Sequence, residues 1–328
     1  MFITYLRSSS IGAYEWCPHK YFLTYALGLP DVSGKKAVKG SCVHKALEIL
    51  ARKKWAEQKE EEIVIDSEMG VRWPIEDITP DNAIEWAIAH YKQDSWDHLD
   101  IRDIRKWTYE VLTWRDGTFS PLQREIVAPE QYFDITLEFP WANYDYLLAD
   151  GTKISGKFAI RGTMDLITRV SPGVLEYVDY KTGRRLNWNT GKEKGWEDLT
   201  KDKQFLLYYY ALKHLYPDDE IIFTVYYIQD GGPYTICFGP EHLKQAEKML
   251  ETYFIRIKND KRPRLIYPSW KCERLCHYHK TEHPDSGKTV CQHFKDELIS
   301  LGMDRVVMKH ADLSRATAYT EGGGRVHV

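Results

Sequence analysis

The chain has 328 residues, of which 43% are hydrophobic and 28% are charged. This balance is typical of globular proteins and excludes disordered and collagen-like chains, and no apolar run approaches the ~18 residues that a membrane span requires. The length corresponds to about two average domains or to one elaborated α/β domain. Lysine and arginine number 45 against 48 aspartates and glutamates, a net charge of −3, so any nucleic acid would have to be bound by local basic patches.

The N-terminal segment predicts helices. Residues 8–29 begin with serines suited to a helix N-cap, and Pro18 is expected to break this run into two short helices. Residues 40–58 have the pattern of a packed helix, in which apolar side chains share one face. These side chains follow the i, i+4, i+7 spacing: Val43, Leu47 and Leu50.

The next part of the chain predicts an insertion. Residues 59–80 are charged and contain prolines, which is typical of a connection. Residues 81–117 are rich in aromatic side chains and have helical periodicity over most of their length. We therefore expect a helical insertion over residues 59–125.

The remainder of the chain predicts strands interrupted and followed by helices, and hence an α/β fold. The strand-like runs are residues 132–139, 157–170, 174–182, 221–229 and 234–238. The helical runs are residues 202–216 and 241–259. The resulting division is into N-terminal helices (1–58), the helical insertion (59–125), a core (126–260), a cysteine-rich region (261–300) and a C-terminal tail (301–328).

The six cysteines are few for a chain of this length, which does not favour a disulfide-rich secreted protein. The first apolar run is too short for a secretory signal, so we expect a cytoplasmic location. In a reducing compartment, clustered cysteines are more typical of metal binding than of disulfides. Four of them have the arrangement of such a site: Cys17, Cys272, Cys276 and Cys291.

The strongest candidates for catalytic residues lie in residues 174–183. On a strand, alternate side chains share a face, so Asp179 and Lys181 project together. Asp165 lies seven residues before the turn near Pro172 and Asp179 lies seven after it, so a hairpin would bring the two carboxylates close. Two such carboxylates form a hard oxygen site for Mg²⁺ or Mn²⁺, which hydrolysis of a phosphodiester requires. The alternative is a structural cross-strand salt bridge.

Other residues occur with this pair in a fixed order. Gly40 precedes His44 as G-x3-H, Gly162 precedes Asp165 as G-x2-D, and D-x-K is followed by a Q-x3-Y motif at Gln204 and Tyr208. This order resembles that of the RecB-like and AddB-like nucleases of the PD-(D/E)xK superfamily. The resemblance extends over about residues 8–291, although only the motif blocks are specific.

The resemblance implies a fold and a set of site residues. The fold would be a restriction-endonuclease-like core, a central mixed β-sheet flanked by helices, with a metal-cluster region that joins the N- and C-terminal segments. The catalytic metal, Mg²⁺ or Mn²⁺, would be bound by His44, Asp165, Asp179 and the carbonyl of Tyr180. Lys181 would assist the attacking water, and the site would be supported by Gln204, Tyr208 and, by a looser match, Glu130.

The cysteines match the same family. Several members bind a 4Fe-4S cluster through one N-terminal cysteine in a C-P-x2-Y pattern, which Cys17 matches here, and three C-terminal cysteines. The spacings of Cys272, Cys276 and Cys291 are looser than those of the family. Histidines lie in the same segment, so a structural Zn²⁺ and unmetallated thiols stay open as alternatives. They are His277, His279, His283 and His293.

A basic loop between the D-x-K strand and the glutamine helix is the expected DNA-binding surface. Cations that contact phosphates, together with aromatic rings for unpaired bases, are typical of single-strand binding. The candidates are Arg184, Arg185, Lys192, Lys194 and Trp188. The alternative is a solvated loop whose tryptophans point inward.

The resemblance favours a metal-dependent DNA exonuclease that acts on single strands or duplex ends in recombination, repair or DNA processing. A helicase or recombination protein would be its partner, no membrane would be involved, and a bacterial or a phage origin suits the chain equally. The first alternative is a non-catalytic DNA-binding scaffold of a recombination or CRISPR-adaptation complex. Two others are a zinc-stabilised RNA-binding module and a sequence-specific restriction-type endonuclease.

Overall fold

The structure is a computed structural model that describes residues 1–147, 150–151, 153–186, 191–264 and 270–311. Contacts between residues divide the chain into two units. The first unit comprises residues 1–33, 133–162 and 245–328, and the second comprises residues 34–132 and 163–244. In the described part of the chain, no helix has both the length and the apolar character needed to cross a bilayer.

A six-stranded mixed sheet is the centre of the fold. In the order β1-β7-β8-β9-β10, with β4 also paired to β7, the pairs β1–β7 and β8–β9 are parallel, whereas β7–β8 and β9–β10 are antiparallel. The sheet and its flanking helices confirm the predicted fold class. The strands are β1 (Tyr5–Leu6), β4 (Glu125–Thr136), β7 (Ala159–Ser171), β8 (Val174–Lys181), β9 (Glu220–Tyr227) and β10 (Gly232–Cys237).

Helix α3 (Lys35–Gln58) packs on one face of the sheet in the second unit. Its buried side chains Val43 and Leu47 belong to the same apolar cluster as Val178 and Tyr180 of β8, and burial of each aliphatic side chain stabilises the fold by about 1.5–3 kcal/mol. The helix begins at Lys35, five residues before the predicted start. The close approach of α3 to the end of β8 explains Gly40, since a Cβ there would lie 2.7 Å from Thr182 Oγ1.

Helix α7 (Lys203–Leu215) packs on the opposite face of the same strands. Tyr177 of β8 makes an edge-on contact with Tyr208, at 5.6 Å between ring centroids, because odd-numbered residues of β8 point away from α3. The side chain of Asp202 caps the helix by accepting from the Gln204 main-chain N–H at 3.0 Å. This cap places Gln204 in the first turn, beside the end of β8. The short helix α6 (Trp196–Thr200) precedes α7.

The insertion contains a hairpin that the sequence analysis did not predict. Residues 59–80, expected to be a connection, include the antiparallel strands β2 (Ile63–Asp66) and β3 (Val71–Pro74). Gly70, with φ +67°, permits the turn between them, and Trp73 of β3 stacks on Trp86 at 4.7 Å. This packing, made with a helix further along the chain, stabilises a hairpin whose charged flanking residues suggested a loop.

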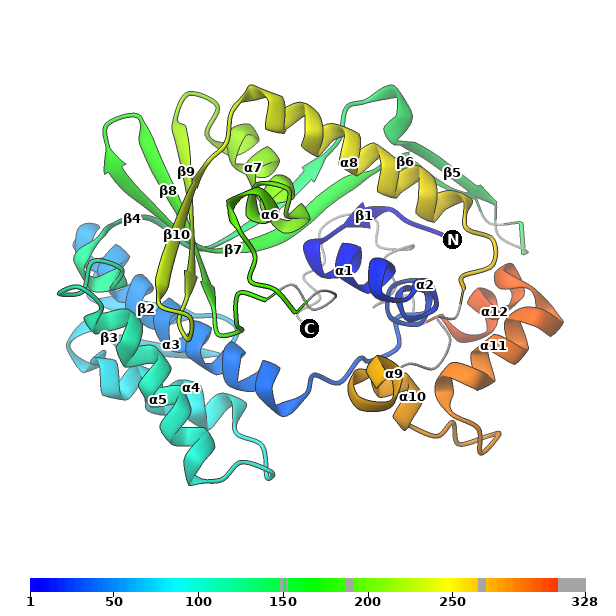
Figure 1. Cartoon of the computed structure of the whole chain (residues 1–328), viewed down its shortest axis with the longest axis horizontal. Coiled ribbons are helices and arrows are strands. Elements are labelled where there is room, and N and C mark those ends of the chain that lie inside the picture. The colour runs from blue at the N-terminus through cyan, green and yellow to red at the C-terminus, as the bar shows by residue number, and fades with distance from the viewer. Residues whose placement is uncertain (148–149, 152, 187–190, 265–269, 312–328) are drawn as a thin grey trace. The chain divides into compact units, whose positions relative to one another are not determined.

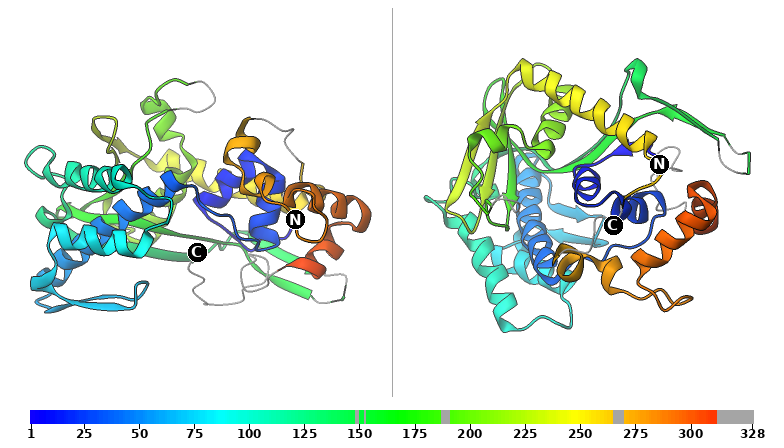
Figure 2. Two further views of the ribbon diagram at one scale, coloured as in Figure 1. Left: turned by 90° about the horizontal axis from the view of Figure 1, so that it is seen from below. Right: turned by 45° about the vertical axis from the view of Figure 1, so that its right-hand side comes forward.

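The helical periodicity of residues 81–117 is confirmed over most of its length. Helices α4 (Pro80–Tyr91) and α5 (His98–Thr113) pack with α3, and the blue and cyan elements of this group stay together in both views of Figure 2. The Thr79 hydroxyl caps α4, and the Asp97 carboxylate caps α5. A single-turn 3₁₀ helix follows at Pro121–Gln123.

The first unit is mainly helical. The predicted break at Pro18 is confirmed, because α1 (Ser8–Trp16) ends at Cys17, whose backbone is extended, although Arg7 rather than a serine precedes its first turn. Residues 303–310, which were assigned to the tail, form helix α12, and the rest of that tail after residue 311 lies outside the described residues. The other elements are α2 (Pro18–Tyr21), a π-helical turn (Phe22–Ala26), a 3₁₀ turn (Pro140–Ala142), β5 (Asn143–Leu147), β6 (Lys153–Lys157), α8 (Pro240–Asn259), α9 (Trp270–Leu275), α10 (His277–Lys280), α11 (Val290–Leu301) and α12 (Met303–His310).

Candidate functional site

Asp179 and Lys181 form a close ion pair at the end of β8, as the strand alternation predicts. The Asp179 side chain is 2% exposed, and Lys181 Nζ lies 3.0 Å from its Oδ1 and 2.8 Å from its Oδ2. The Tyr177 hydroxyl, on the same face, donates to Oδ1 at 3.0 Å. The carboxylate is therefore held by neighbouring side chains in one orientation.

Gln204 joins this pair from α7. Its Oε1 accepts from Lys181 Nζ at 3.2 Å, and its Nε2 donates to Asp179 Oδ1 at 3.2 Å. Tyr208, one turn later on the helix, contacts the pair indirectly through Tyr177. The structure thus brings the Q-x3-Y and D-x-K residues together.

Asp165 and His44 meet where the main-chain ladder between β7 and β8 ends. The paired register runs as far as Leu166 opposite Val178, and beyond it the Tyr180 main-chain N–H donates to Asp165 Oδ2 at 2.9 Å. His44 Nδ1 lies 3.3 Å from the same oxygen. Continuation of the register places Asp165 opposite Asp179, as the hairpin argument predicts.

A small cavity of about 10 Å³ lies beside His44 and Asp165, room for roughly one water-sized sphere. Its polar lining also includes Glu48 and Glu130, and its remaining walls are Leu47, Ala51, Leu166 and Tyr180. The sequence analysis did not identify Glu48. The signal was its position four residues after His44, which places both side chains on one face of α3.

Glu130 has an unusual backbone conformation within β4. Its φ is +48°, a left-handed value that is costly for a residue with a Cβ. Before Glu130 the even-numbered Ala128 is buried, whereas after it the odd-numbered Phe133 is buried. The side chains of β4 that face inward therefore change from even to odd positions near Glu130. The irregularity directs the Glu130 side chain to the cavity, and such bulged strands are common beside active sites.

The electrostatics of the site are dominated by buried carboxylates. Burial, followed by the charges of Asp165 and Glu48, raises the pKa of Glu130 well above its usual value. Burial also raises the pKa of Asp179, although the Lys181 charge opposes this effect. Burial alone would lower the pKa of Lys181, but the charges of Asp179 and Asp165 raise it, so Lys181 stays an ammonium ion at neutral pH.

These residues fit a hard divalent cation. Carboxylate oxygens and an imidazole nitrogen surround a space the size of one ion, and oxygen-rich sites suit Mg²⁺ and Mn²⁺. Burial and then the charges of Asp165 and Glu48 disfavour a charged Glu130 and raise its pKa. A bound cation would offset the charges of these acids.

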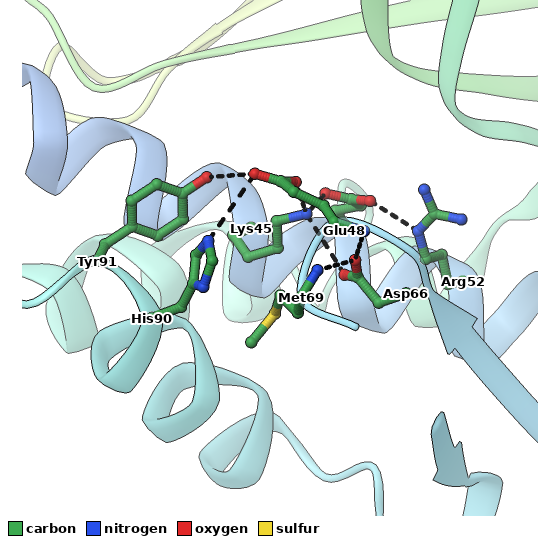
Figure 3. A network of polar contacts seen from close by, with 8 residues as sticks. Lys45, Glu48, Arg52, Asp66, Met69, His90 and Tyr91 are labelled. Atoms are coloured by element: carbon green, nitrogen blue, oxygen red, sulfur yellow. Dashed lines mark hydrogen bonds and ion pairs between the residues drawn. The ribbon is translucent and has the colours of Figure 1, made fainter. Parts of the chain in front are cut away.

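A second network holds Glu48 in place (Figure 3). Lys45, which is 3% exposed, lies 2.6 Å from Glu48 Oε2 and 3.4 Å from Asp66 Oδ2, and it also contacts Glu68. Arg52 Nε donates to Glu48 Oε1 at 2.7 Å. The positive charges of Lys45 and Arg52 therefore neutralise the Glu48 carboxylate and hold it at the cavity wall.

The basic loop carries four of the predicted DNA-binding cations. Arg184 and Lys192 are exposed. Arg185 instead holds the loop together, since its Nη2 contacts Glu193 at 2.7 Å and its guanidinium lies 4.2 Å from the centroid of the Tyr234 ring. Lys194 pairs with Asp202 at 3.0 Å, and Trp188 lies outside the described residues. Trp196 is the aromatic side chain exposed near this loop, at 55%.

The four predicted cysteine ligands come together within the first unit. Burial and then the neighbouring thiols of Cys17, Cys276 and Cys272 raise the pKa of Cys291 to about 12. His19 joins the two ends of the chain at this place, since its Nε2 lies 3.1 Å from the Cys291 carbonyl oxygen. Cysteines far apart in the sequence thus form one cluster of thiols.

Comparison with known proteins identifies the family. No curated protein matches the sequence. Among solved structures, the crystal structure of a "Putative exonuclease" from Eubacterium rectale is similar with a TM-score of 0.48 and 13% identity, covering 83% of this chain and 88% of that one. The family model of the PD-(D/E)XK nuclease superfamily matches residues 8–281, and the chain therefore belongs to that superfamily.

Proposed function

We propose that the protein is a metal-dependent DNA exonuclease of the RecB-like and AddB-like type that acts on single strands or duplex ends in DNA recombination, repair or processing. The observation that carries this proposal is the buried Asp179, Lys181 and Gln204 group beside a cavity lined by carboxylates and His44. A chain that had kept only the fold would have no need of buried acids arranged in this way.

The catalytic Mg²⁺ or Mn²⁺ would be held by His44, Asp165, Asp179 and the Tyr180 carbonyl. Of these residues, His44, Asp165 and Tyr180 line the cavity together with Glu130 and Glu48. When bound, the ion would polarise the scissile phosphoryl group and lower the pKa of a coordinated water. The acids of this set supply the oxygen ligands that such an ion prefers.

Lys181 contributes positive charge beside the acids of the site. Because its pKa is raised, its ammonium group stays protonated and can donate to the phosphoryl oxygens as negative charge develops on them. Gln204 and Asp179 orient the ammonium group before substrate binds. An arrangement of this kind requires little reorganisation during the reaction.

DNA would be bound near the loop between β8 and α7. Arg184 and Lys192 would contact phosphates, and Trp196 would provide a surface on which an unpaired base can stack. Arg185 and Lys194 would support the loop through their ion pairs. A helicase or another recombination protein is the partner that we infer.

A 4Fe-4S cluster is the group that we infer for Cys17, Cys272, Cys276 and Cys291. A four-iron cluster takes four cysteine thiolates. These four cysteines supply that number, and the charges of the Cys17, Cys276 and Cys272 thiols act on Cys291.

The substitution Cys276→Ala is expected to yield colourless, poorly soluble protein, because a ligand of the cluster that joins the two ends of the first unit is lost. Iron content and visible absorption after anaerobic purification are the measurements. Cys237→Ala, which replaces an exposed cysteine of the second unit, is the matched control and should keep the colour. Wild-type protein with zinc at these cysteines and no iron would contradict the assignment.

The activity is tested by a time course on end-labelled single- and double-stranded DNA with Mg²⁺ or Mn²⁺. An exonuclease should release short products progressively from free ends and leave circles and blocked ends intact. Cleavage of circles would instead identify an endonuclease. Binding of DNA without cleavage under any metal condition would favour the non-catalytic scaffold.

A further inference from the structure

Three potential metal ligands converge near the C-terminal end of the described chain, in the first unit. His293 and Glu297 lie four residues apart on one face of α11, and His310 lies at the end of α12. Their ligand atoms all lie within 4.8 Å of one another. Figure 1 shows α11 and α12 next to each other in orange and red, and the two helices are in contact.

The orientation of these groups is that of ligands around a common point. Glu297 Oε2 lies 2.5 Å from His310 Nε2, and Glu297 Oε1 lies 3.8 Å from His293 Nε2. Glu297 Oε2 and both Nε2 atoms are buried, and their contacts with one another do not have hydrogen-bond geometry. Since Zn–N and Zn–O distances are about 2.0–2.2 Å, the ligands of one tetrahedral zinc lie about 3.4 Å apart, between these two distances.

The ring of His293 is already held in place for this role. Its Nδ1 lies 3.0 Å from the Ser286 hydroxyl, and the ring stacks on His283 at 3.6 Å between centroids. Histidines that bind metals usually use the second ring nitrogen for such a hydrogen bond, which fixes the tautomer. In this arrangement Nε2 is the nitrogen directed to the cluster.

The α11–α12 pair has a small apolar core. Of the described residues in the two helices, those that are buried and apolar are Phe294, Val306 and Val307. Helices of 12 and 8 residues are marginal on their own, and small substructures with a limited core are commonly stabilised by a structural metal. A cross-link between the helices would supply this stability.

We propose that His293, Glu297 and His310 bind a Zn²⁺ that fastens α12 to α11. Two imidazoles and one carboxylate are a ligand set that zinc accepts, with the fourth position left to water. Cys291 lies on the same helix, two residues before His293. The zinc site thereby also stabilises the helix that carries one of the four clustered thiols, while its own ligands are separate from them.

The test is the zinc and iron content of the full-length protein after purification and dialysis against buffered Zn²⁺. Wild type should hold one zinc that is lost in His310→Asn and Glu297→Gln, whereas iron should be the same in all three proteins. The zinc affinity should fall by more than the roughly 10–100-fold that loss of an outer partner costs. Cobalt should give the visible absorption of a tetrahedral site in wild type alone.

Lys309→Met is the matched control, because Lys309 Nζ pairs with Glu297 Oε1 at 2.6 Å without belonging to the ligand set. This variant should keep its zinc and gain thermal stability on zinc addition, as wild type does. Equal zinc content in wild type and His310→Asn would overturn the proposal. So would a melting temperature that falls equally in Lys309→Met and His310→Asn and does not respond to zinc, since this result would identify an ion-pair cluster.

Discussion

Asp179→Asn is expected to lower the rate of DNA cleavage about 10³-fold or more, with little effect on folding or DNA affinity. The substitution keeps the shape of a nearly buried side chain but removes the charge that orients Lys181 and that would bind the metal. Loss of one preorganised electrostatic contact typically costs 10²–10³-fold, and loss of a metal ligand adds to this cost. Lys181→Ala should have an effect of similar size, because it removes the charge closest to the acids.

Single-turnover cleavage of end-labelled DNA measures this loss, and thermal unfolding and DNA binding with Ca²⁺ show whether the variants are folded and bind. Lys248→Ala is the matched control, because Lys248 is 74% exposed and pairs with Glu251 on the surface of α8, outside the proposed DNA-binding loop. Exposed pairs of this kind contribute about 0–1 kcal/mol, so the control should cleave normally. Undiminished cleavage by Asp179→Asn or Lys181→Ala would refute the site.

Lys45→Met is expected to lower the free energy of unfolding by about 3–5 kcal/mol. Lys45 is buried among Glu48, Asp66 and Glu68, and methionine has a similar length without the charge. Removal of one partner leaves the other charges buried without compensation, which costs more than the pair itself contributes. Because Glu48 lines the candidate metal cavity, the folded fraction of this variant should also cleave DNA more slowly.

Urea unfolding followed by fluorescence measures the change in stability. Lys248→Met is the control, since Lys248 is 74% exposed and pairs with Glu251 on the surface of α8, where the expected change is below about 1 kcal/mol. A loss below about 1 kcal/mol for Lys45→Met would show that water or a rearrangement compensates the three acids. In that case the network would not be what holds Glu48 at the cavity.

Several features of the site could be predicted because they depend on the geometry of single elements. The two-residue period of a strand determines that Asp179 and Lys181 share a face, and the turn after Ser171 determines that Asp165 reaches the level of Asp179. The mixed sheet and most of its flanking helices were also predictable, because their apolar periodicity is strong.

Other features depend on contacts between segments far apart in the sequence. Glu48 and Lys45 are ordinary helix residues until the β2–β3 hairpin brings acids against them, and that hairpin was not predicted because its stability comes from Trp86. Arginine commonly contacts DNA, but in the structure the Arg185 side chain is engaged in contacts that hold the loop together. Contacts between residues of distant segments cannot be predicted from the spacing of residues along the sequence.

The sequence by itself determined the order of the motifs and the direction of each side chain within its own strand or helix, because periods of 2 and 3.6 residues are properties of the local backbone. Only the tertiary structure decided which acids share a cavity, where Glu130 adopts a left-handed backbone and which histidines converge between α11 and α12. The physical reason is that burial and electrostatic interaction depend on distances between elements, and packing of the whole chain determines these distances.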